Sequence, residues 1–329
     1  MVLGRLFALK TSGTLFSGNS FYRILLIFFI FVSAAAFIPA IGAIFLTILP
    51  LLAFFHSAVA GKAKTAAAFL IPLLLVFLLS QWLQLSSPYL VILTMGIAGL
   101  AINFFAFKNS SIEKTVIYPA LIIIGAICAF FIYSGFTLSL SPWKVVEQFV
   151  DQAIEQNMIL YEQFPLEKED ISAMRSSKPM LVSFFTGIFP ALSILGSIML
   201  VWLNVLMGRN FLRKTAIILP QLEGLSRWKA PEYVIWIFII SGGLLLFPDE
   251  EFRFFSLNIF IMTGFIYLLQ GLAILSCFFQ TKNVPVFFRY IFYFLIALQQ
   301  FLVIPIAITG LFDIWIDFRR FFKKNLPIT

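Results

Sequence analysis

The sequence is poor in the side chains that most enzymes use for chemistry. It has one histidine, His56, and two cysteines, Cys128 and Cys277, which lie in separate apolar runs. Three such residues far apart cannot supply the three or four ligands of a zinc site. The sequence also has no phosphate-binding glycine loop and no G-x-S-x-G or H-E-x-x-H element. We therefore expect no metal, no cofactor and no enzymatic activity, and we expect the cysteines to be packed as free thiols.

Charge is also scarce. Only 12% of the 329 residues are charged, about half of the usual share in a soluble domain. Hydrophobic residues make up 61%, and the mean hydropathy is +1.01. Apolar runs near 20 residues long recur through the chain, which indicates an all-α polytopic membrane protein with the lipid bilayer as its main partner. The net charge of +8 is scattered between these runs, which argues against nucleic acid and for orientation across a membrane.

Nine stretches have the composition of membrane-spanning helices. The first apolar run, 24–60, is too long for one span, and Pro39 with Gly42 predicts a break inside it. The expected spans are 24–38, 41–58, 66–84, 88–107, 115–137, 179–207, 232–248, 257–279 and 287–309.

One long hydrophilic segment, 138–178, separates spans five and six. It holds seven acidic and four basic residues. We therefore expect three parts: a five-span bundle in 1–137, this acidic segment, and a four-span bundle with a basic tail in 179–329.

The loops between spans differ in charge. Alternate loops, starting at the amino terminus, hold 14 of the 23 Lys and Arg residues and three acidic residues. The other loops hold five basic and ten acidic residues. The positive-inside rule therefore predicts a cytoplasmic amino terminus, with the 138–178 segment outside.

The carboxyl-terminal tail disagrees with this pattern. Nine spans from a cytoplasmic start leave the tail outside, yet its basic residues favour the cytoplasm: Arg319, Arg320, Lys323 and Lys324. Either span nine is broken near Pro305 and the chain returns, or the tail lies on the outer surface as an amphipathic helix.

The hydrophilic segment contains a predicted amphipathic helix. Ser141 and Pro142 are typical of a helix start. Apolar residues then recur at helical spacing as far as Phe164, with acidic residues and glutamines on the other face. This helix is expected either to lie on the membrane surface or to cover the outer mouth of the bundle.

Amides near the middle of spans need partners, because lipid offers none. Gln270 lies near the middle of span eight, and Gln299 and Gln300 near the middle of span nine, at similar depth. An amide-to-amide hydrogen bond between these helices is one interpretation, and a ligand-binding cavity is the other. Trp82 and Gln84, at the outer end of span three, are either part of an interfacial belt or the rim of an outward-facing pocket.

Small residues predict close helix contacts. Ala36 and Ala40 form a small-xxx-small pair at the end of span one, and Gly96 and Gly99, three residues apart, give a similar small surface on span four. Packing inside this chain and docking of another membrane subunit both fit this pattern.

Asp313 and Asp317 lie four residues apart on one predicted helix. The spacing fits pairing with Arg320 and with lipid head groups at the membrane interface. Binding of a cation, as in a membrane enzyme, is the alternative. No acidic or basic residue falls in the middle of an expected span, which argues against an ion-coupled pump.

Four segments together resemble a known family. They are Leu93-Thr-Met-Gly-Ile-Ala-Gly-Leu-Ala-Ile-Asn-Phe104 followed by Lys108, Arg227-Trp-Lys-Ala-Pro-Glu-Tyr-Val-Ile-Trp236, Asn258 through Tyr267-Leu-Leu-Gln-Gly-Leu-Ala273, and Gly310-Leu-Phe-Asp-Ile-Trp-Ile-Asp-Phe-Arg-Arg320. They resemble the YybS-like bacterial membrane proteins (domain of unknown function 2232), over nearly the whole chain.

That family is in turn similar, over its first six spans, to the substrate-binding S-components of energy-coupling factor transporters. This resemblance implies a small-molecule ligand bound toward the outer face and a coupling subunit docked on Ala36 and Ala40. A structural or regulatory protein of envelope or complex assembly, which docks partners on its basic 208–230 loop, is the alternative function.

Overall fold

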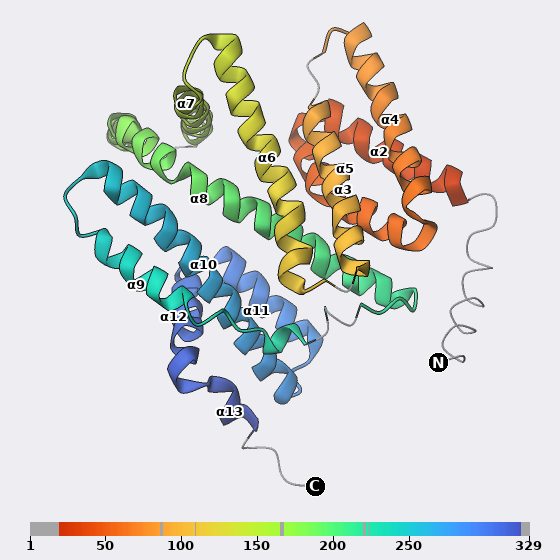
Figure 1. Ribbon diagram of the computed structural model, residues 1–329. Coiled ribbons are helices and arrows are strands. Elements are labelled where there is room, and N and C mark those ends of the chain that lie inside the picture. Colours follow the sequence, from red (N-terminus) through yellow and green to blue (C-terminus); the bar gives the residue numbers. More distant parts are fainter. Residues whose placement is uncertain are drawn as a thin grey trace, which may run out of the picture. The chain divides into compact units, whose positions relative to one another are not determined.

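The computed structural model describes residues 20–85, 88–108, 110–164, 168–219, 222 and 224–323. Every regular element in these residues is a helix (Figure 1). The chain forms two compact units: unit 1 comprises Met1–Phe130 and Gly196–Leu222, and unit 2 comprises Phe131–Leu195 and Glu223–Thr329. Two long helices, α6 (Ile112–Leu138) and α8 (Lys168–Lys214), each contribute to both units. The three consecutive parts expected from the sequence stay a prediction.

Unit 1 is built mainly from four consecutive helices. They are α2 (Ser20–Phe37), α3 (Pro39–Ala60), α4 (Lys62–Trp82) and α5 (Tyr89–Phe107). α2 packs against α3 and α4, and α3 packs against α5. The break between α2 and α3 falls at Ile38 and α3 begins with Pro39, which confirms the break predicted inside the first apolar run.

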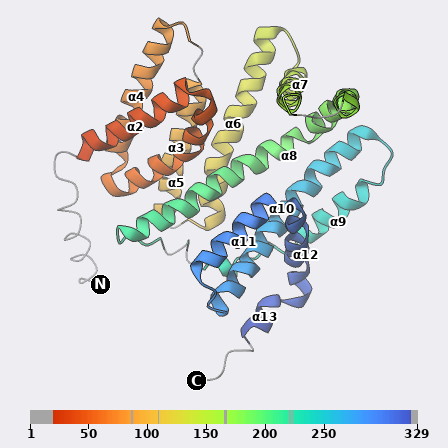
Figure 2. The same cartoon turned by 180° about the vertical axis from the view of Figure 1, so that it is seen from behind.

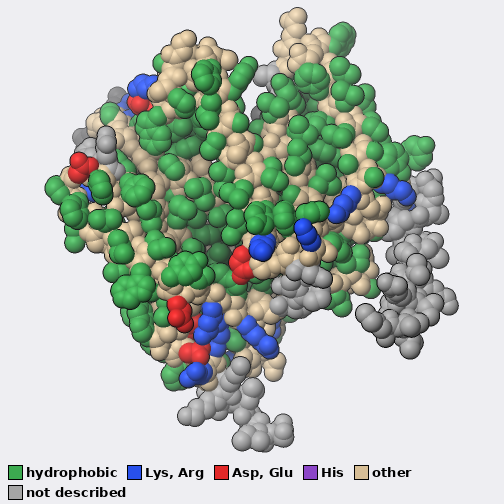
Figure 3. Space-filling model, in the orientation of Figure 1, with side chains coloured by type: hydrophobic (Ala, Val, Ile, Leu, Met, Phe, Trp, Pro, Cys, Tyr) green, Lys and Arg blue, Asp and Glu red, His purple; other side chains and the backbone are tan. Residues whose placement is uncertain are grey.

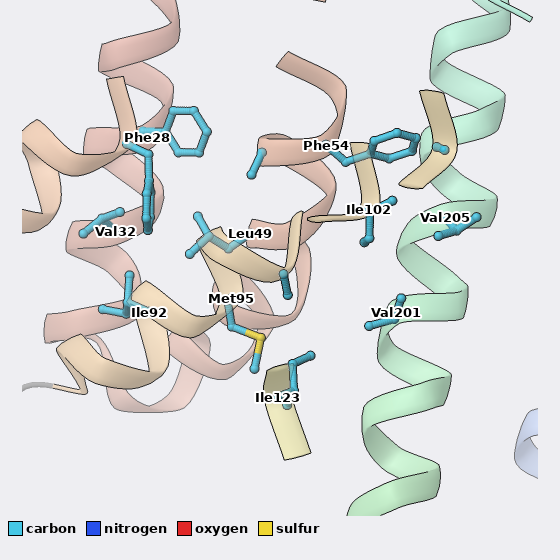
Figure 4. Packing of buried hydrophobic residues seen from close by; sticks show 14 of the residues in the cluster. Phe28, Val32, Leu49, Phe54, Ile92, Met95, Ile102, Ile123, Val201 and Val205 are labelled. Carbon is cyan, nitrogen blue, oxygen red and sulfur yellow. The ribbon is translucent and has the colours of Figure 1, made fainter. Parts of the chain in front are cut away.

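A single hydrophobic core holds unit 1 together. It combines fully buried side chains from α2, α3 and α5, such as Phe28, Leu49 and Ile102, with Ile123 of α6 and Val201 of α8 (Figure 4). The second half of α8 is also tied by a polar contact, because Asn204 Nδ2 donates to the carbonyl oxygen of Thr47 over 3.0 Å.

Unit 2 begins with the end of α6 and the hydrophilic segment. α7 (Pro142–Tyr161) starts at Ser141, whose side chain accepts a hydrogen bond from the Lys144 amide. This confirms the predicted helix start. α7 buries Val145, Val146, Val150 and Met158.

The rest of unit 2 is arranged around one 32-residue helix, α10 (Glu250–Thr281). Packed against it are η2 (Leu225–Arg227), α9 (Val234–Leu244), α12 (Gln300–Ile316) and α13 (Phe318–Lys323). α9 and α10 run side by side as a hairpin in both views (Figures 1 and 2). α11 (Val286–Leu298) precedes α12 and packs on it.

Six described helices are long and apolar enough to cross a bilayer: Ile41–Ala60, Lys62–Trp82, Tyr89–Phe107, Ile112–Leu138, Ile171–Lys214 and Phe252–Thr281. Hydrophobic side chains are spread over the whole of the face seen in Figure 3, and many large ones are exposed. Large exposed apolar surface of this kind is typical of contact with lipid rather than water. The chain is therefore a polytopic, all-helical membrane protein.

The described helices do not reach the expected count of nine spans. Counting the α11–α12 pair as one span raises the number from six to seven. The expected span 232–248 is the 11-residue helix α9, which rises only about 16 Å against a hydrocarbon core of about 30 Å. The expected span 24–38 is the shorter apolar helix Phe21–Phe37.

The expected ninth span is broken. α11 and α12 meet at Gln299 with a bend of 107°. The break does not lie at Pro305, as one interpretation of the sequence predicted, because Pro305 is inside α12. The chain then turns again at Asp317, which has a left-handed backbone conformation (φ 44°) between α12 and α13.

Two glycines let α10 and α12 cross at backbone contact. A Cβ atom at Gly310 would collide with the carbonyl oxygen of Tyr267, and one at Gly271 would collide with the carbonyl oxygen of Ile306. Backbone atoms cannot move aside as a flexible side chain can, so this crossing requires glycine.

We predict that Gly310→Ala lowers the free energy of unfolding in detergent by about 1–3 kcal/mol, because the added methyl forces the helices apart. Gly243→Ala in α9 is the matched control, since a Cβ there meets no atom within 4 Å. The control is expected to be neutral or slightly stabilising. Equal stability of the two variants would contradict the close crossing.

Candidate functional site

The most unusual site in the described residues is a buried carboxylate in unit 2. Asp313 lies on α12, one turn beyond Gly310, and is 1% exposed. Gln270 on α10 is equally buried, and Arg319 on α13 is 7% exposed. Buried charges are costly unless each has partners, so the contacts of these three side chains decide what the site can do.

Both oxygens of the Asp313 carboxylate accept hydrogen bonds from the chain itself. Oδ1 accepts from the backbone N–H of Phe318, and Oδ2 accepts from Nε2 of Gln270, each over 3.0 Å. The first bond spans the turn at Asp317 and fixes the start of α13, which packs against α10. The second bond ties α12 to α10 at the level of the glycine crossing.

The amide oxygen of Gln270 binds a non-helical segment. Its Oε1 accepts from the backbone N–H of Ala230 over 3.0 Å. Ala230 also belongs to a small buried cluster with Val234, Ile235 and Tyr267. This hydrogen bond and the apolar packing fix the loop before α9 along α10.

Arg319 completes the connection between the loop and the tail. Its Nη2 donates to the carbonyl oxygen of Trp228 over 2.8 Å, and its Nη1 donates to that of Arg227 over 3.3 Å. Nη1 is also 3.8 Å from Asp313 Oδ2. We call Gln270, Asp313 and Arg319, with the backbone groups that they bind, the polar clamp.

A second carboxylate lies at the surface of the clamp. Asp317 Oδ2 is 2.8 Å from Arg320 Nε, and its Oδ1 is 3.4 Å from Lys229 Nζ. The predicted pairing of Asp317 with Arg320 is thereby confirmed. Asp313, expected at the interface with the same role, is instead buried and faces Arg319.

The clamp has the chemistry of a structural joint. Both carboxylate oxygens and both amide atoms already have partners in the protein. A base, a metal ligand or an ion-binding carboxylate needs an oxygen that is open to substrate or ion. The described residues also contain no group of three or more His, Cys, Asp or Glu placed to hold a metal ion.

The predicted bond between Gln270 and the amides of span nine is wrong. Gln270 is bonded to Ala230 and Asp313, whereas Gln299 and Gln300 are exposed at the break between α11 and α12. Equal depth of these amides requires two straight helices, whereas the second is bent by 107°.

The other predicted residues lie in unit 1. Trp82 ends α4 and is 79% exposed, and Gln84 is exposed in the turn that follows. Gly96 and Gly99 are buried, and a Cβ on either would collide with Phe69 or Pro50. They therefore pack helices inside unit 1. Ala36 is half-buried at the end of α2, and the side chain of Ala40 lies outside the described residues.

A shallow hollow lies beside α7. Its volume is about 480 Å³, and its lining consists of Lys144, Glu147, Gln148, Asp151, Gln152 and Val182. Ion pairs tie α7 to the first turns of α8, with Lys178 Nζ 2.9 Å from both Asp151 Oδ1 and Glu155 Oε2.

Sequence reasoning missed Asp313 and Arg319 as partners, because a buried pair six residues apart requires the sharp turn at Asp317. One signal was present, however. Three of the four segments that carry the family resemblance, 227–236, 258–273 and 310–320, supply every residue of the polar clamp.

Comparison with known proteins agrees with that resemblance. The model of a family described as "Predicted membrane protein (DUF2232)" matches residues 26–314. The chain is also 21% identical over 265 residues to "Uncharacterized protein YybS" of Bacillus subtilis (strain 168). These aligned residues cover 79% of this chain and 83% of that protein. No solved structure matches. Similarity to S-components stays a prediction.

We predict strong coupling between Asp313 and Arg319 in a double-mutant cycle. Asp313→Leu leaves a buried guanidinium without its carboxylate and is expected to lower the free energy of unfolding by about 3–5 kcal/mol. Adding Arg319→Met removes that isolated charge. The loss in free energy of unfolding of the double variant is therefore expected to be smaller than the sum of the losses of the two single variants.

The exposed pair Lys144 and Glu147 provides the matched cycle. Its atoms are 2.8 Å apart, closer than the 3.8 Å of the clamp pair, yet we expect a coupling of at most about 1 kcal/mol because water screens it. Equal coupling in the two cycles, measured by reversible unfolding in detergent, would count against a buried clamp.

Proposed function

This chain belongs to the DUF2232 family of predicted membrane proteins, and we propose that it is a non-enzymatic, structural protein of the bacterial cytoplasmic membrane. In this proposal its amino terminus is cytoplasmic. Its 208–230 loop serves as a docking surface for a partner subunit in envelope or complex assembly. The single observation that carries the proposal is the polar clamp, because a buried ion pair is used to hold the loop and the tail in place.

The clamp also bears on which side the tail occupies. Arg319 binds the carbonyl oxygens of Arg227 and Trp228, so the tail helix and the end of the 208–230 loop lie at the same end of unit 2. If both are cytoplasmic, 18 of the 23 Lys and Arg residues fall on the cytoplasmic side. That distribution follows the positive-inside rule and supports a returning chain over an external tail.

Labelling of introduced cysteines tests the orientation. In a chain with Cys128 and Cys277 replaced by Ala, we expect a membrane-impermeant maleimide to label Gln156→Cys on α7 in intact spheroplasts. Lys282→Cys and Arg320→Cys are expected to react only after permeabilisation. Labelling of Arg320→Cys in intact spheroplasts would contradict a cytoplasmic tail, and protection of Gln156→Cys would reverse the orientation.

Photo-crosslinking tests the docking role. A photoreactive residue in place of the exposed Lys214 is expected to form a discrete protein adduct in cells, and one in place of Gln156 serves as the control on the other predicted face. The absence of any protein adduct at position 214, at normal expression, would remove the docking function.

An S-component-like role in small-molecule binding or transport is the second candidate. The observation that favours it is the hollow beside α7, whose carboxylate and amide side chains suit a small polar ligand. Native mass spectrometry of gently solubilised protein is then expected to show a ligand mass that Asp151→Asn weakens. No such mass, together with no thermal shift across a vitamin and metal library, would exclude this candidate.

A further inference from the structure

The clamp organises a group of exposed cations. Arg227, Lys229, Lys282 and Arg320 are all exposed and lie on the three segments that meet at the carboxyl-terminal part of α10. We call these four residues the clamped basic surface. In Figure 3, Lys and Arg side chains gather in the region where Figure 1 shows α13.

Side-chain contacts show that these segments adjoin one another. Asp317 lies between Lys229 and Arg320 and pairs with both. Arg319 holds the backbone of Arg227. Ser226 Oγ is 3.2 Å from Gln280 Oε1, which places η2 beside the last turn of α10, just before Lys282. Asp317 neutralises one of the four cations and leaves an excess of three positive charges.

The surroundings of this surface are apolar and aromatic. Trp315 is 62% exposed one turn before Arg319, and Phe321 is 59% exposed beside Arg320. α11 begins four residues after Lys282 and exposes Phe287, Phe288 and Tyr290. Cations bordered by exposed aromatic and apolar side chains are typical of the zone where a protein crosses from hydrocarbon into head groups.

We propose that the clamped basic surface binds the phosphodiester head groups of anionic phospholipids in the cytoplasmic leaflet. The inference rests on the orientation in the proposed function and names the lipid partner of unit 2. It assigns Arg227 and Lys229, at the end of the 208–230 loop, to lipid, and leaves the part of the loop near Lys214 to the protein partner. An arginine fork and a lysine held beside each other match the oxygens of a phosphodiester. Because the clamp fixes their backbones before any lipid arrives, less ordering has to occur on binding. An acidic protein would meet the same charges, but it would leave the adjoining apolar belt uncovered.

The test compares phosphatidylglycerol with phosphatidylcholine, titrated into the purified full-length protein and followed by native mass spectrometry. We expect wild type to bind phosphatidylglycerol selectively. Lys229→Gln with Arg320→Gln is expected to weaken that binding roughly 25-fold, since each cation near an anionic head group contributes about fivefold. Lys229→Arg with Arg320→Lys keeps both charges and is expected to retain selectivity.

The matched control removes the same charges from the predicted outer side. Lys144→Gln with Arg253→Gln is expected to leave selectivity unchanged, since both residues are exposed outside the clamped surface. An equal loss in the control would reduce the effect to net charge and overturn the inference. Inorganic phosphate or glycerol phosphate that displaces the lipid at millimolar concentration would assign the surface to a soluble phosphate instead.

The lipid inference and the proposed function can fail separately. If Lys282→Cys is labelled from the cytoplasm but wild type does not distinguish the two lipids, the inference is wrong while the orientation stands. If a photoreactive residue at Arg227 yields only protein adducts, the surface belongs to a protein partner rather than to lipid.

Discussion

The need of one buried carboxylate for partners accounts for much of unit 2. Asp313 is almost fully enclosed, and a charge in that position is tolerated only when hydrogen bonds and an opposite charge surround it. α10 supplies Gln270, the tail supplies Arg319 and the Phe318 amide, and Gln270 in turn holds Ala230. A loop, a long helix and a carboxyl-terminal helix are thereby joined at one point. Gly271 and Gly310 make that point possible, because the backbones of α10 and α12 touch there.

The polar clamp also determines which parts of unit 2 lie on the same side of the membrane. A basic tail and a basic loop that bind each other have to share one side of the bilayer, whatever the number of spans between them. The bend between α11 and α12 gives the chain a route back to that side. The described helices thus combine a large exposed apolar surface with one end at which a basic loop and a basic helix are held together.

Much of the architecture could be predicted from the sequence. Apolar runs identify where helices lie, Pro39 marks the first break, and Ser141 with Pro142 marks the start of α7. The failures have a common physical cause, which is tertiary geometry that composition does not encode. Hydropathy treats residues 287–309 as one straight span, although the chain bends at Gln299. Asp313 and Arg319 meet only because Asp317 adopts a left-handed conformation.

Hydrogen–deuterium exchange of the Ala230 and Phe318 amides, measured in lipid nanodiscs, tests the clamp most directly. Ala230 lies outside any helix, and the Phe318 amide follows the left-handed turn at Asp317, so the usual helical protection does not apply to either. If Gln270 and Asp313 accept their hydrogen bonds as described, both amides exchange as slowly as the core of α10, and replacement of Asp313 by Asn speeds exchange at Phe318. Exchange of both amides at the rate of a solvated loop would show that the polar clamp does not exist in the membrane.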